Sequence, residues 1–405
     1  MAMYFRFLNP SSQDDYEQLY GVMDSAFKDE ELSSIVRRFV EYHPEMTERE
    51  YFMVKAGDKA VAGLVLIPEK WNIDGVELKV AEMGCVGTDP EYRRRGLQRI
   101  LNEKFDEHAR EADYDLCVLA GIPFFYRQFG YQYAVELDYL TEIESDKLPM
   151  ETCLTYRPFE ESDISVAQKL LERTQDKYMV HSVRTKIVWQ MQEKTATYGA
   201  EPFQDTVIVD EIGVAAYFRS WPDIEQKTLI IRELIQRDKS LSEGIAAVIR
   251  EEAEKQGLDK VKTKLSHLDD FSQYLIGLGA TVNKPYAWQV KILDMKSFLL
   301  KLAPVLGKRL VDSEFWELSR ELKINFWKYA LNLVFSDGQL VRVEEISDPG
   351  RKIGMNPYAA IQLFMGYRSR ADLEYAYPDF YVRDGLEKLI DVLFPCRPSY
   401  IHFCY

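Results

Sequence analysis

The first part of the chain alternates between two hydrophobic periods. Apolar, β-rich runs at residues 51–54 and 61–67 flank the turn pair Gly57-Asp58, which predicts a β-hairpin. Residues 76–86 continue as a third strand. After Pro90, apolar side chains recur three and four positions apart, as on one face of a helix. These helical positions are Leu97, Ile100, Leu101, Phe105 and Ala109.

The same kinds of pattern close the first unit and then recur. Residues 116–120 predict a buried strand, 124–129 a short helix and 134–140 a closing strand. Antiparallel strands followed by a strand–helix–strand crossover predict a mixed α/β sheet. Similar elements follow, in the same order, at residues 207–209, 214–218, 229–235, 241–256, 261–264, 271–278 and 288–293. We therefore predict two copies of one fold, in residues 1–150 and 151–294.

A third unit is expected in residues 295–405. A helical pattern at 298–306 precedes an apolar, β-rich stretch at 326–335, and residues 340–344 answer it after the turn pair Asp337-Gly338. Further helical patterns occur at 357–364 and 386–394. The tail after residue 394 is rich in aromatic side chains, which are seldom left free in water, so we expect it to dock.

Composition adds a charge argument to this layout. Hydrophobic residues make up 46% of the chain and charged residues 29%, which is typical of globular proteins. The 51 Lys and Arg residues against 66 Asp and Glu residues give a net charge of −15. This acidity argues against nucleic-acid binding and is compatible with a cationic substrate. The acidic run Asp29, Glu30 and Glu31 is either part of a cationic acceptor pocket or a solvated loop.

Cysteine, histidine and apolar patterns narrow the setting. The five cysteines form no Cys-x-x-Cys pair, which indicates free thiols in a reducing compartment. The five histidines show no ligand spacing, so we expect no metal site. The N-terminus shows no leader pattern, and no apolar run approaches the length of a membrane span. We therefore expect a cytoplasmic protein that does not insert into membranes.

Residues 86–98, Val-Gly-Thr-Asp-Pro-Glu-Tyr-Arg-Arg-Arg-Gly-Leu-Gln, carry the most informative chemistry. A strand leads there through a basic, glycine-containing turn into a helix. Unpaired N–H groups at a helix N-terminus attract phosphates, and nearby arginines strengthen the attraction. Gly96 lets the backbone approach an anionic group closely. On spacing alone, a solvated basic turn before an amphipathic helix is an equally good interpretation.

This segment resembles the coenzyme A-binding motif of the GNAT acetyltransferases, Arg/Gln-x-x-Gly-x-Gly/Ala. Arg93, Gly96 and Gln98 stand at its three marked positions, with Gln98 where the family has a small residue. The Arg-Arg-Arg-Gly-Leu form, and residues 126–131 (Tyr-Arg-Gln-Phe-Gly-Tyr), are similar to the enhanced intracellular survival (Eis-like) subgroup. The resemblance implies an α/β chain of tandem GNAT folds, the second degenerate, followed by a sterol-carrier-protein-like α/β domain.

The resemblance also implies how acetyl-CoA would bind. Backbone groups at Val86 and Thr88 would align the pantetheine arm and polarise the acetyl carbonyl. The backbone of residues 93–99 would hold the pyrophosphate, and Gly121 would line the gap beside the thioester. The implied cofactor-binding residues are Val86, Gly87, Thr88, Arg93, Arg94, Arg95, Gly96, Leu97, Gln98, Arg99 and Gly121.

Two residues acquire catalytic roles through the same resemblance. Tyr126 would protonate the departing coenzyme A thiolate. The α-carboxylate of Tyr405 would take the proton of the amine, because in the Eis-like subgroup the C-terminus reaches back into the active site. The alternatives are that Tyr126 is a packing tyrosine and that Tyr405 ends a packed tail. Cys85 and Cys404 are expected to be small buried side chains rather than nucleophiles.

We therefore expect an acetyl-CoA-dependent N-acetyltransferase that acts by direct transfer in a ternary complex. The acceptor would be an amine of a small polycation, with aminoglycosides as one possibility because some relatives accept them, or a lysine side chain. Residues 236–244 lack the glycine spacing, so the second unit should not bind coenzyme A. Relatives form oligomers, often hexamers, and we expect a homo-oligomer. The alternative function is a non-enzymatic protein that senses acetyl-CoA or binds a lipid.

Overall fold

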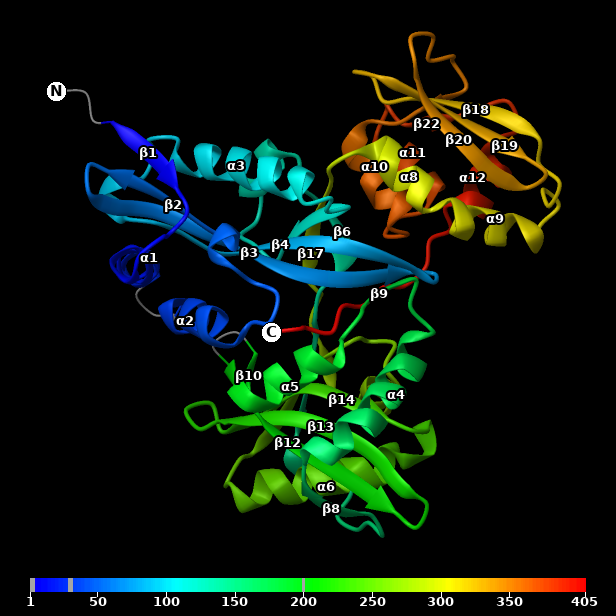
Figure 1. The fold of residues 1–405 in the computed structure, drawn as a ribbon. Coiled ribbons are helices and arrows are strands. Elements are labelled where there is room, and N and C mark those ends of the chain that lie inside the picture. The colour runs from blue at the N-terminus through cyan, green and yellow to red at the C-terminus, as the bar shows by residue number, and fades with distance from the viewer. Residues whose placement is uncertain (1–3, 28–31, 199–200) are drawn as a thin grey trace.

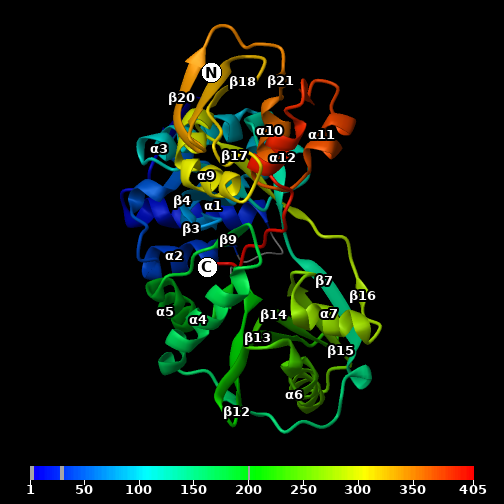
Figure 2. The same cartoon turned by 90° about the vertical axis from the view of Figure 1, so that its right-hand side faces the viewer.

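Three units share the chain. The computed structural model describes residues 4–27, 32–198 and 201–405. In Figure 1 the first unit lies at the upper left, the second unit below it, and the C-terminal unit at the upper right. Each unit is built on its own β-sheet. The C-terminal end of the chain lies between the first and second units in both ribbon views (Figures 1 and 2).

The first sheet is mixed and carries helices on both faces. Its strand order is β1 (Phe5–Leu8), β2 (Tyr51–Ala56), β3 (Lys59–Ile73), β4 (Val76–Thr88), β5 (Leu116–Leu119), β17 (Ala287–Ile292) and β6 (Gln132–Glu136), and β9 (Val180–Ser182) also pairs with β3. Its helices are α1 (Gln13–Ala26), α2 (Leu32–Tyr42) and α3 (Leu97–Glu111). Because strand residues alternate between faces, Phe52 and Val54 pack with α3, whereas Tyr51 and Met53 pack with α1 and α2.

The second sheet repeats this arrangement. Its strand order is β8 (Thr155–Pro158), β12 (Gln204–Asp210), β13 (Gly213–Asp223), β14 (Thr228–Gln236), β15 (Lys260–Leu265), β7 (Tyr139–Glu144) and β16 (Thr281–Val282). One face packs with α4 (Ile164–Gln175) and α5 (Lys186–Thr195), and the other with α6 (Ser242–Lys255) and α7 (Asp270–Gly277). A small hairpin joins β10 (Thr197–Tyr198) to β11 (Glu201–Pro202). The second unit is thus a second copy of the first architecture.

The two sheets exchange strands, since β7 joins the second sheet while β17 and the short β9 join the first. β7 lies near the end of the predicted first unit but pairs with β15 and β16 of the second sheet. β17 lies near the end of the predicted second unit but pairs with β5 and β6. The single closing strand predicted at 134–140 is therefore wrong. β6 ends at Glu136, and β7 begins at Tyr139 in the other sheet. The local pattern gives no sign of the change, because a strand looks the same whichever sheet it joins.

The C-terminal unit places helices against a smaller sheet. Its strand order is β20 (Gln339–Ile346), β19 (Ala330–Ser336), β18 (Arg320–Asn325), β21 (Ile353–Gly354) and β22 (Tyr381–Val382). Its helices are α8 (Met295–Lys301), α9 (Ala303–Val311), α10 (Pro357–Phe364), α11 (Arg370–Ala376) and α12 (Glu387–Leu393). The strand predicted at 326–335 starts only at Ala330, because the residues before it form a turn in which Trp327 has φ of 69°.

The cores of the first and C-terminal units are continuous. One cluster of buried side chains runs from Trp71 and Trp288 of the first sheet to Leu322 and Phe364 of the C-terminal unit. Trp71 and Trp288 meet edge to face, with ring centroids 5.8 Å apart. Such a shared core fixes the C-terminal unit, and the tail that follows it, relative to the first sheet.

The tail docks against several elements at once, as its aromatic composition predicts. The Met179 N–H donates to the Pro398 carbonyl at 2.8 Å, and the Tyr400 N–H donates to the Val180 carbonyl at 3.0 Å. Arg397 forms an ion pair with Asp74 in the turn between β3 and β4 at 2.7 Å. The backbone of the tail therefore runs beside β9.

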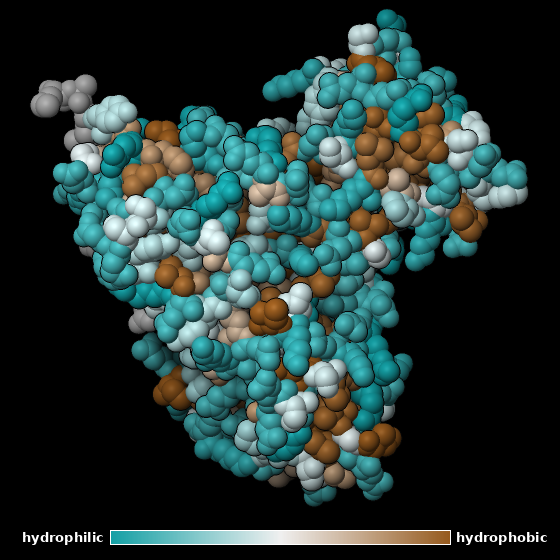
Figure 3. Space-filling model, viewed as in Figure 1, coloured by the Kyte–Doolittle hydropathy of each residue, from teal (hydrophilic) through white to brown (hydrophobic). Residues whose placement is uncertain are grey.

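The mixed α/β class predicted from the sequence is confirmed. Within residues 4–27, 32–198 and 201–405, no helix combines the length and the apolar character that a membrane span requires. The face in Figure 3 is mostly hydrophilic, and apolar side chains gather chiefly over the C-terminal unit.

Candidate active site

A gap between β4 and β5 forms the base of the site. The two strands pair in parallel only from Val80 to Glu82 and then part. Beyond that point β4 carries a bulge, in which Cys85 and Val86 stand opposite the single residue Leu64. Cys85 adopts φ of 48°, a left-handed conformation that suits a bulge. Because a bulge bends its strand, it turns the end of β4 away from β5 and opens the sheet.

The N-terminus of α3 lies beside this gap. Gly96 caps the helix with φ of 77° and supplies no side-chain hydrogen bond to it, and Arg94 is also left-handed, with φ of 62°. The N–H groups of the first turn are thus left without a side-chain cap, and the helix end carries a partial positive charge. Together with the arginines before it, this turn is suited to binding a phosphate group.

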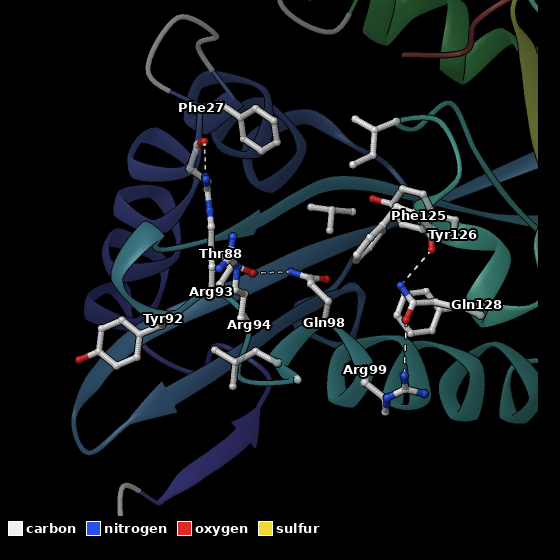
Figure 4. Close-up of a pocket in the computed structure, with 16 residues that line it drawn as sticks. Phe27, Thr88, Tyr92, Arg93, Arg94, Gln98, Arg99, Phe125, Tyr126 and Gln128 are labelled. Carbon is white, nitrogen blue, oxygen red and sulfur yellow. Dashed lines mark hydrogen bonds between the residues drawn. The ribbon is translucent and has the colours of Figure 1, made fainter.

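Two pockets lie at this site. The smaller pocket, of about 420 Å³, opens over the turn and the helix (Figure 4). It contains most of the predicted coenzyme-binding residues, namely Val86, Thr88, Arg93, Arg94, Gly96, Leu97, Gln98 and Arg99. Gly87 and Arg95 do not line it. Arg95 instead donates to the Glu91 carbonyl at 3.2 Å and lies over the Tyr92 ring. Sequence reasoning missed the apolar wall formed by Phe125 and Phe129.

Gln98, the residue that departs from the family motif, ties β4 to α3. Its Nε2 donates to the Gly87 carbonyl at 3.0 Å and to the Thr88 Oγ1 at 2.9 Å. Its Oε1 is buried and finds no hydrogen-bond partner among the described residues. A small residue at this position would leave the end of β4 without these two bonds.

Tyr126 lies where the site deepens. It belongs to the short 3-10 helix η3 (Phe125–Phe129), where the sequence predicts a short helix, and its side chain is buried. A Cβ atom on Gly121 would lie 2.5 Å from the Tyr126 ring, so only glycine permits this packing. Burial raises the pKa of Tyr126 to about 12, which keeps its hydroxyl protonated at neutral pH.

A larger pocket of about 800 Å³ lies between the first unit, the second unit and the tail. It contains Gly121 and Tyr405 from the predicted site. Phe27, Val86, Ile122 and Tyr126 line both pockets. The two pockets therefore meet at a common wall, with Tyr126 in it.

The charges of the larger pocket are largely balanced. Arg232 pairs with Asp138, and Lys264 pairs with Glu201. Glu82 is the remaining acidic side chain among the described lining residues, and Tyr405 carries the α-carboxylate. The acidic run Asp29, Glu30 and Glu31 lies outside the described residues. The described walls alone therefore do not form a strongly anionic trap for a polycation.

Tyr405 is anchored at the far side of the larger pocket. Its hydroxyl donates to Glu82 Oε1 at 2.6 Å, and its ring meets Phe39 edge to face, with centroids 5.3 Å apart. Two residues earlier, the Phe403 carbonyl accepts hydrogen bonds from Arg184 and Gln192, each at 3.0 Å. The second unit thus holds the end of the tail against the first unit.

Glu82 and its neighbour Glu69 were missed by sequence reasoning. Both are buried on the first sheet, although Glu82 stands between the apolar residues Ala81 and Met83 and Glu69 is followed by Lys70, as in an ordinary strand. The sequence did offer one sign of a buried carboxyl group. Glu82 is two residues from Val80 in the predicted strand, so it shares a face with a side chain that is fully buried. Buried carboxyl groups are rare unless they have partners.

The cysteines and the metal-binding side chains give no competing chemistry. Cys85 lines the larger pocket, but burial raises the pKa of its thiol to about 12, so little thiolate exists at neutral pH. Burial also raises the pKa of the Cys404 thiol. In the part of the chain that the structure describes, no three His, Cys, Asp or Glu side chains gather as a metal site would require.

Comparison with known families decides the class of this site. Residues 8–134 match the family model described as "Acetyltransferase (GNAT) domain". These residues form a GNAT acetyltransferase domain. The chain is thus an acyltransferase, and the matched range contains the α3 turn, both pocket walls from β4 and β5, and Tyr126. Curated proteins give no match in sequence.

Solved structures share the fold over nearly the whole chain. The GCN5-related N-acetyltransferase from Anabaena variabilis ATCC 29413 is 18% identical, with a TM-score of 0.74 over 98% of this chain and 99% of that one. A conserved protein from Enterococcus faecalis V583, titled a probable N-acyltransferase, is 14% identical, with a TM-score of 0.76 over 99% and 100%. Eis1 from Mycobacterium abscessus is 15% identical, with a TM-score of 0.67 over 99% and 100%.

Proposed function

We propose that this chain is an acetyl-CoA-dependent N-acetyltransferase that transfers the acetyl group directly to an amine. The smaller pocket would hold the coenzyme and the larger pocket the acceptor. The observation that carries the proposal is the common wall of the two pockets, at Val86, Ile122 and Tyr126. Two substrates that enter from opposite sides of this wall would meet beside the hydroxyl of Tyr126.

The residues of the smaller pocket fit coenzyme A. The α3 turn offers backbone N–H groups to a pyrophosphate, and the guanidinium groups of Arg93, Arg94 and Arg99 supply countercharge. Val86 and Thr88 lie on the bulged end of β4, where their backbone would orient the pantetheine arm as the GNAT resemblance implies. The coenzyme supplies a thioester that an amine attacks without a covalent enzyme intermediate.

The protons of this reaction need a donor and an acceptor. Tyr126 would donate its hydroxyl proton to the leaving thiolate, and burial keeps that proton in place at neutral pH. The α-carboxylate of Tyr405 would take the proton from the amine, the role implied by the Eis-like resemblance. The presence of Tyr405 in the wall of the larger pocket supports this assignment.

The acceptor would be an amine on a small molecule, including a polycation such as an aminoglycoside, or a lysine side chain. Apolar walls from Ile35, Ile67 and Met83 would contact its carbon skeleton, and the balanced ion pairs would contact its polar groups. Net acidity elsewhere on the chain would draw a cationic acceptor toward the protein.

We further infer that the whole chain follows the Eis-like plan. The units would be an N-terminal GNAT domain at 1–150, a degenerate GNAT domain at 151–294, and a sterol-carrier-protein-like domain at 295–405. The full-length similarity to Eis1 supports the layout. The protein would act in the cytoplasm as a homo-oligomer. Sedimentation or light scattering of the purified protein tests the oligomer, and a single monomeric species would contradict it.

Thiol release from acetyl-CoA tests the proposed reaction. The acceptor panel contains polyamines, aminoglycosides and lysine peptides, with intact protein compared against a chain that lacks only Tyr405. Turnover that collapses on this deletion supports the terminal base. Equal turnover in both proteins keeps the enzyme and discards that base. Coenzyme binding without transfer to any amine would contradict the proposed function.

Tyr126→Phe tests the proton donor. We expect kcat to fall by roughly 10²–10⁴-fold, the usual contribution of a positioned acid, with little change in the KM for acetyl-CoA. Tyr131→Phe is the matched control, because Tyr131 is buried beside Tyr126 with ring centroids 6.1 Å apart. Equal rates in the two variants would remove Tyr126 from the mechanism.

A further inference from the structure

Two buried carboxyl groups lie side by side beneath the larger pocket. Glu69 of β3 is 5% exposed and Glu82 of β4 is 2% exposed. The strands are antiparallel, with Ile67 opposite Glu82, so Glu69 stands diagonally across from Glu82 on the same face. The two carboxyl groups are close enough for the negative charge of Glu69 to raise the pKa of Glu82. A pair of this kind has no role in the mechanism described so far.

Two of the four carboxyl oxygens of the pair accept a hydrogen bond. Trp71 Nε1 donates to Glu69 Oε2 at 2.8 Å, and the Tyr405 hydroxyl donates to Glu82 Oε1 at 2.6 Å. The other two oxygens, Glu69 Oε1 and Glu82 Oε2, are buried and have no donor among the described residues. Two ionised carboxylates close together inside a protein repel each other strongly. One proton shared by the pair would remove this repulsion and would give the two unpaired oxygens a hydrogen bond.

We propose that Glu69 and Glu82 hold one proton between them and that this carboxyl pair positions Tyr405 in the larger pocket. The proton would sit on Glu82 Oε2 and donate to Glu69 Oε1. Glu82 Oε1 is then a carbonyl oxygen that accepts the Tyr405 hydroxyl. The result is a chain of hydrogen bonds from Trp71 in the core to Tyr405 in the tail. Glu69 and Glu82 are thus positioning residues, and their effect on catalysis rests on the proposed function.

The surroundings of the pair favour uptake of a proton. Burial raises the pKa of Glu69 to about 7, and burial together with the negative charge of Glu69 raises the pKa of Glu82. Other titratable or charged groups around the pair come from the tail, β4, α2, β14 and the segment after β9. Tyr405, Cys404 and Cys85 feel the charge of the pair directly, whereas Arg38 acts on the Cys85 thiol and Arg184 and Glu233 act on the Cys404 thiol. Arg184 forms an ion pair with Glu233 at 2.6 Å, so its positive charge does little to stabilise the ionised forms of Glu69 and Glu82.

Unfolding equilibria at several pH values test the shared proton without any substrate. Because folding raises the pKa of both carboxyl groups, the stability contributed by a proton on the pair is present below about pH 4.5 and is lost as pH rises through the raised pKa, about 7 for Glu69. Glu69→Gln replaces the ionisable group by an amide whose N–H takes the place of the shared proton. Relative to wild type, the folding equilibrium constant of this variant should rise at least roughly tenfold between pH 5 and pH 7.5.

Glu77→Gln is the matched control for this measurement. Glu77 lies on the same strand, β4, but is exposed and forms only a surface ion pair with Lys70 at 3.3 Å. Its replacement should leave the pH dependence of unfolding parallel to that of wild type. If Glu69→Gln also gives a parallel curve, the pair holds no proton and the proposal is overturned.

Alkylation of Cys404, followed by peptide mass mapping, tests the positioning of the tail. Cys404 is 7% exposed and adjoins Tyr405, so release of the tail exposes its thiol. At pH 7.5 we expect Glu82→Leu and Tyr405→Phe each to raise its alkylation rate by about tenfold or more. Exposed Cys396 should label equally in all proteins, and buried Cys117 should stay protected, which separates tail release from unfolding.

Activity supplies the last readout. With any amine that wild type accepts, Tyr405→Phe and Glu82→Leu should lower kcat more than they raise the KM for acetyl-CoA, because the coenzyme pocket is untouched. Wild type without transferase activity would refute the proposed function, while unfolding and alkylation would still judge the carboxyl pair. Wild-type protection of Cys404 in both variants would overturn the positioning role even if the enzyme is active.

Discussion

The first and second units differ in what occupies the gap between their two parallel strands. In the first unit β4 and β5 part after Glu82, and pockets occupy the opening. In the second unit β14 and β15 pair over residues 228–231 and 260–263 and then part as well. Here the Tyr400 hydroxyl donates to the Lys264 carbonyl at 2.8 Å, and Arg232 lies over the Phe403 ring. The tail of the chain thus occupies the second opening.

The turns after β4 and β14 also differ in how well they suit a phosphate group. Before α3, the turn is rich in arginine, and Gly96 leaves the helix without a side-chain cap. Before α6, Asp238 accepts the Ser240 N–H at 2.8 Å and places a carboxylate where a phosphate would have to bind. This difference supports the expectation that only the first unit binds coenzyme A. In the second unit, the opening between β14 and β15 instead holds residues of the tail.

Cutting the chain between the two copies should have the largest effect. Residues 1–150 alone lack β17, which lies between β5 and β6, so β6 would lose its only neighbour in the sheet path and β5 would be left with an unpaired edge. We expect this fragment to be unfolded or aggregated by circular dichroism and gel filtration. Co-expression with residues 151–405 supplies β17 and should restore a soluble complex. A folded, monomeric 1–150 fragment would show that the exchange is dispensable.

Gly96→Asp should make the first turn resemble the second. A carboxylate at the N-terminus of α3 would repel the pyrophosphate at the point where the partial positive charge is strongest. We expect the Kd for acetyl-CoA to rise roughly a hundredfold, or about 2.7 kcal/mol, by calorimetry. Asp238→Gly in the second turn is the control and should leave the Kd unchanged. Unaltered affinity in Gly96→Asp would move the phosphate site away from α3.

Gly121→Ala tests whether the position of Tyr126 beside the gap between β4 and β5 matters for catalysis. The added methyl group would lie 2.5 Å from the Tyr126 ring and from Leu119 Cδ1, so the ring has to shift. We expect kcat to fall about tenfold, because a misplaced acid transfers its proton poorly. Gly21→Ala in α1 is the matched control, since nothing lies within 4 Å of its added Cβ. Full activity in Gly121→Ala would mean that the Tyr126 position is not critical.

Gln98→Ala should give the smallest effect. It removes the bonds from Gln98 Nε2 to Gly87 and Thr88 but leaves the backbone of α3 intact. We expect a loss of about 1 kcal/mol in the free energy of unfolding, measured by urea denaturation. This is less than two hydrogen bonds would contribute, because the unpaired, buried Gln98 Oε1 is removed with them. Gln128→Ala, on the opposite side of the same pocket, is the comparison variant. A stability above wild type would show that Gln98 is a strained substitution in the motif.

Sequence reasoning reached the elements and the α3 turn because both depend on neighbours in the chain. The helix after Pro90, the hairpins and residues 86–98 are all local patterns. The larger pocket could not be predicted, because its walls come from Glu82, Arg232 and Tyr405, which lie far apart in sequence. The exchange of β7 and β17 was hidden for the same reason, since no local pattern names the sheet that a strand joins.

The reciprocal exchange of β7 and β17 has a consequence for synthesis on the ribosome. The first sheet has all its other main strands once β6 has emerged, but it waits for β17, about 150 residues later. At roughly 5–20 residues per second, that wait lasts on the order of ten seconds. During it, the unpaired edges of β5 and β6 are open to pairing with other nascent chains. Slow synthesis of residues 137–286 should therefore increase the demand of this protein for chaperones.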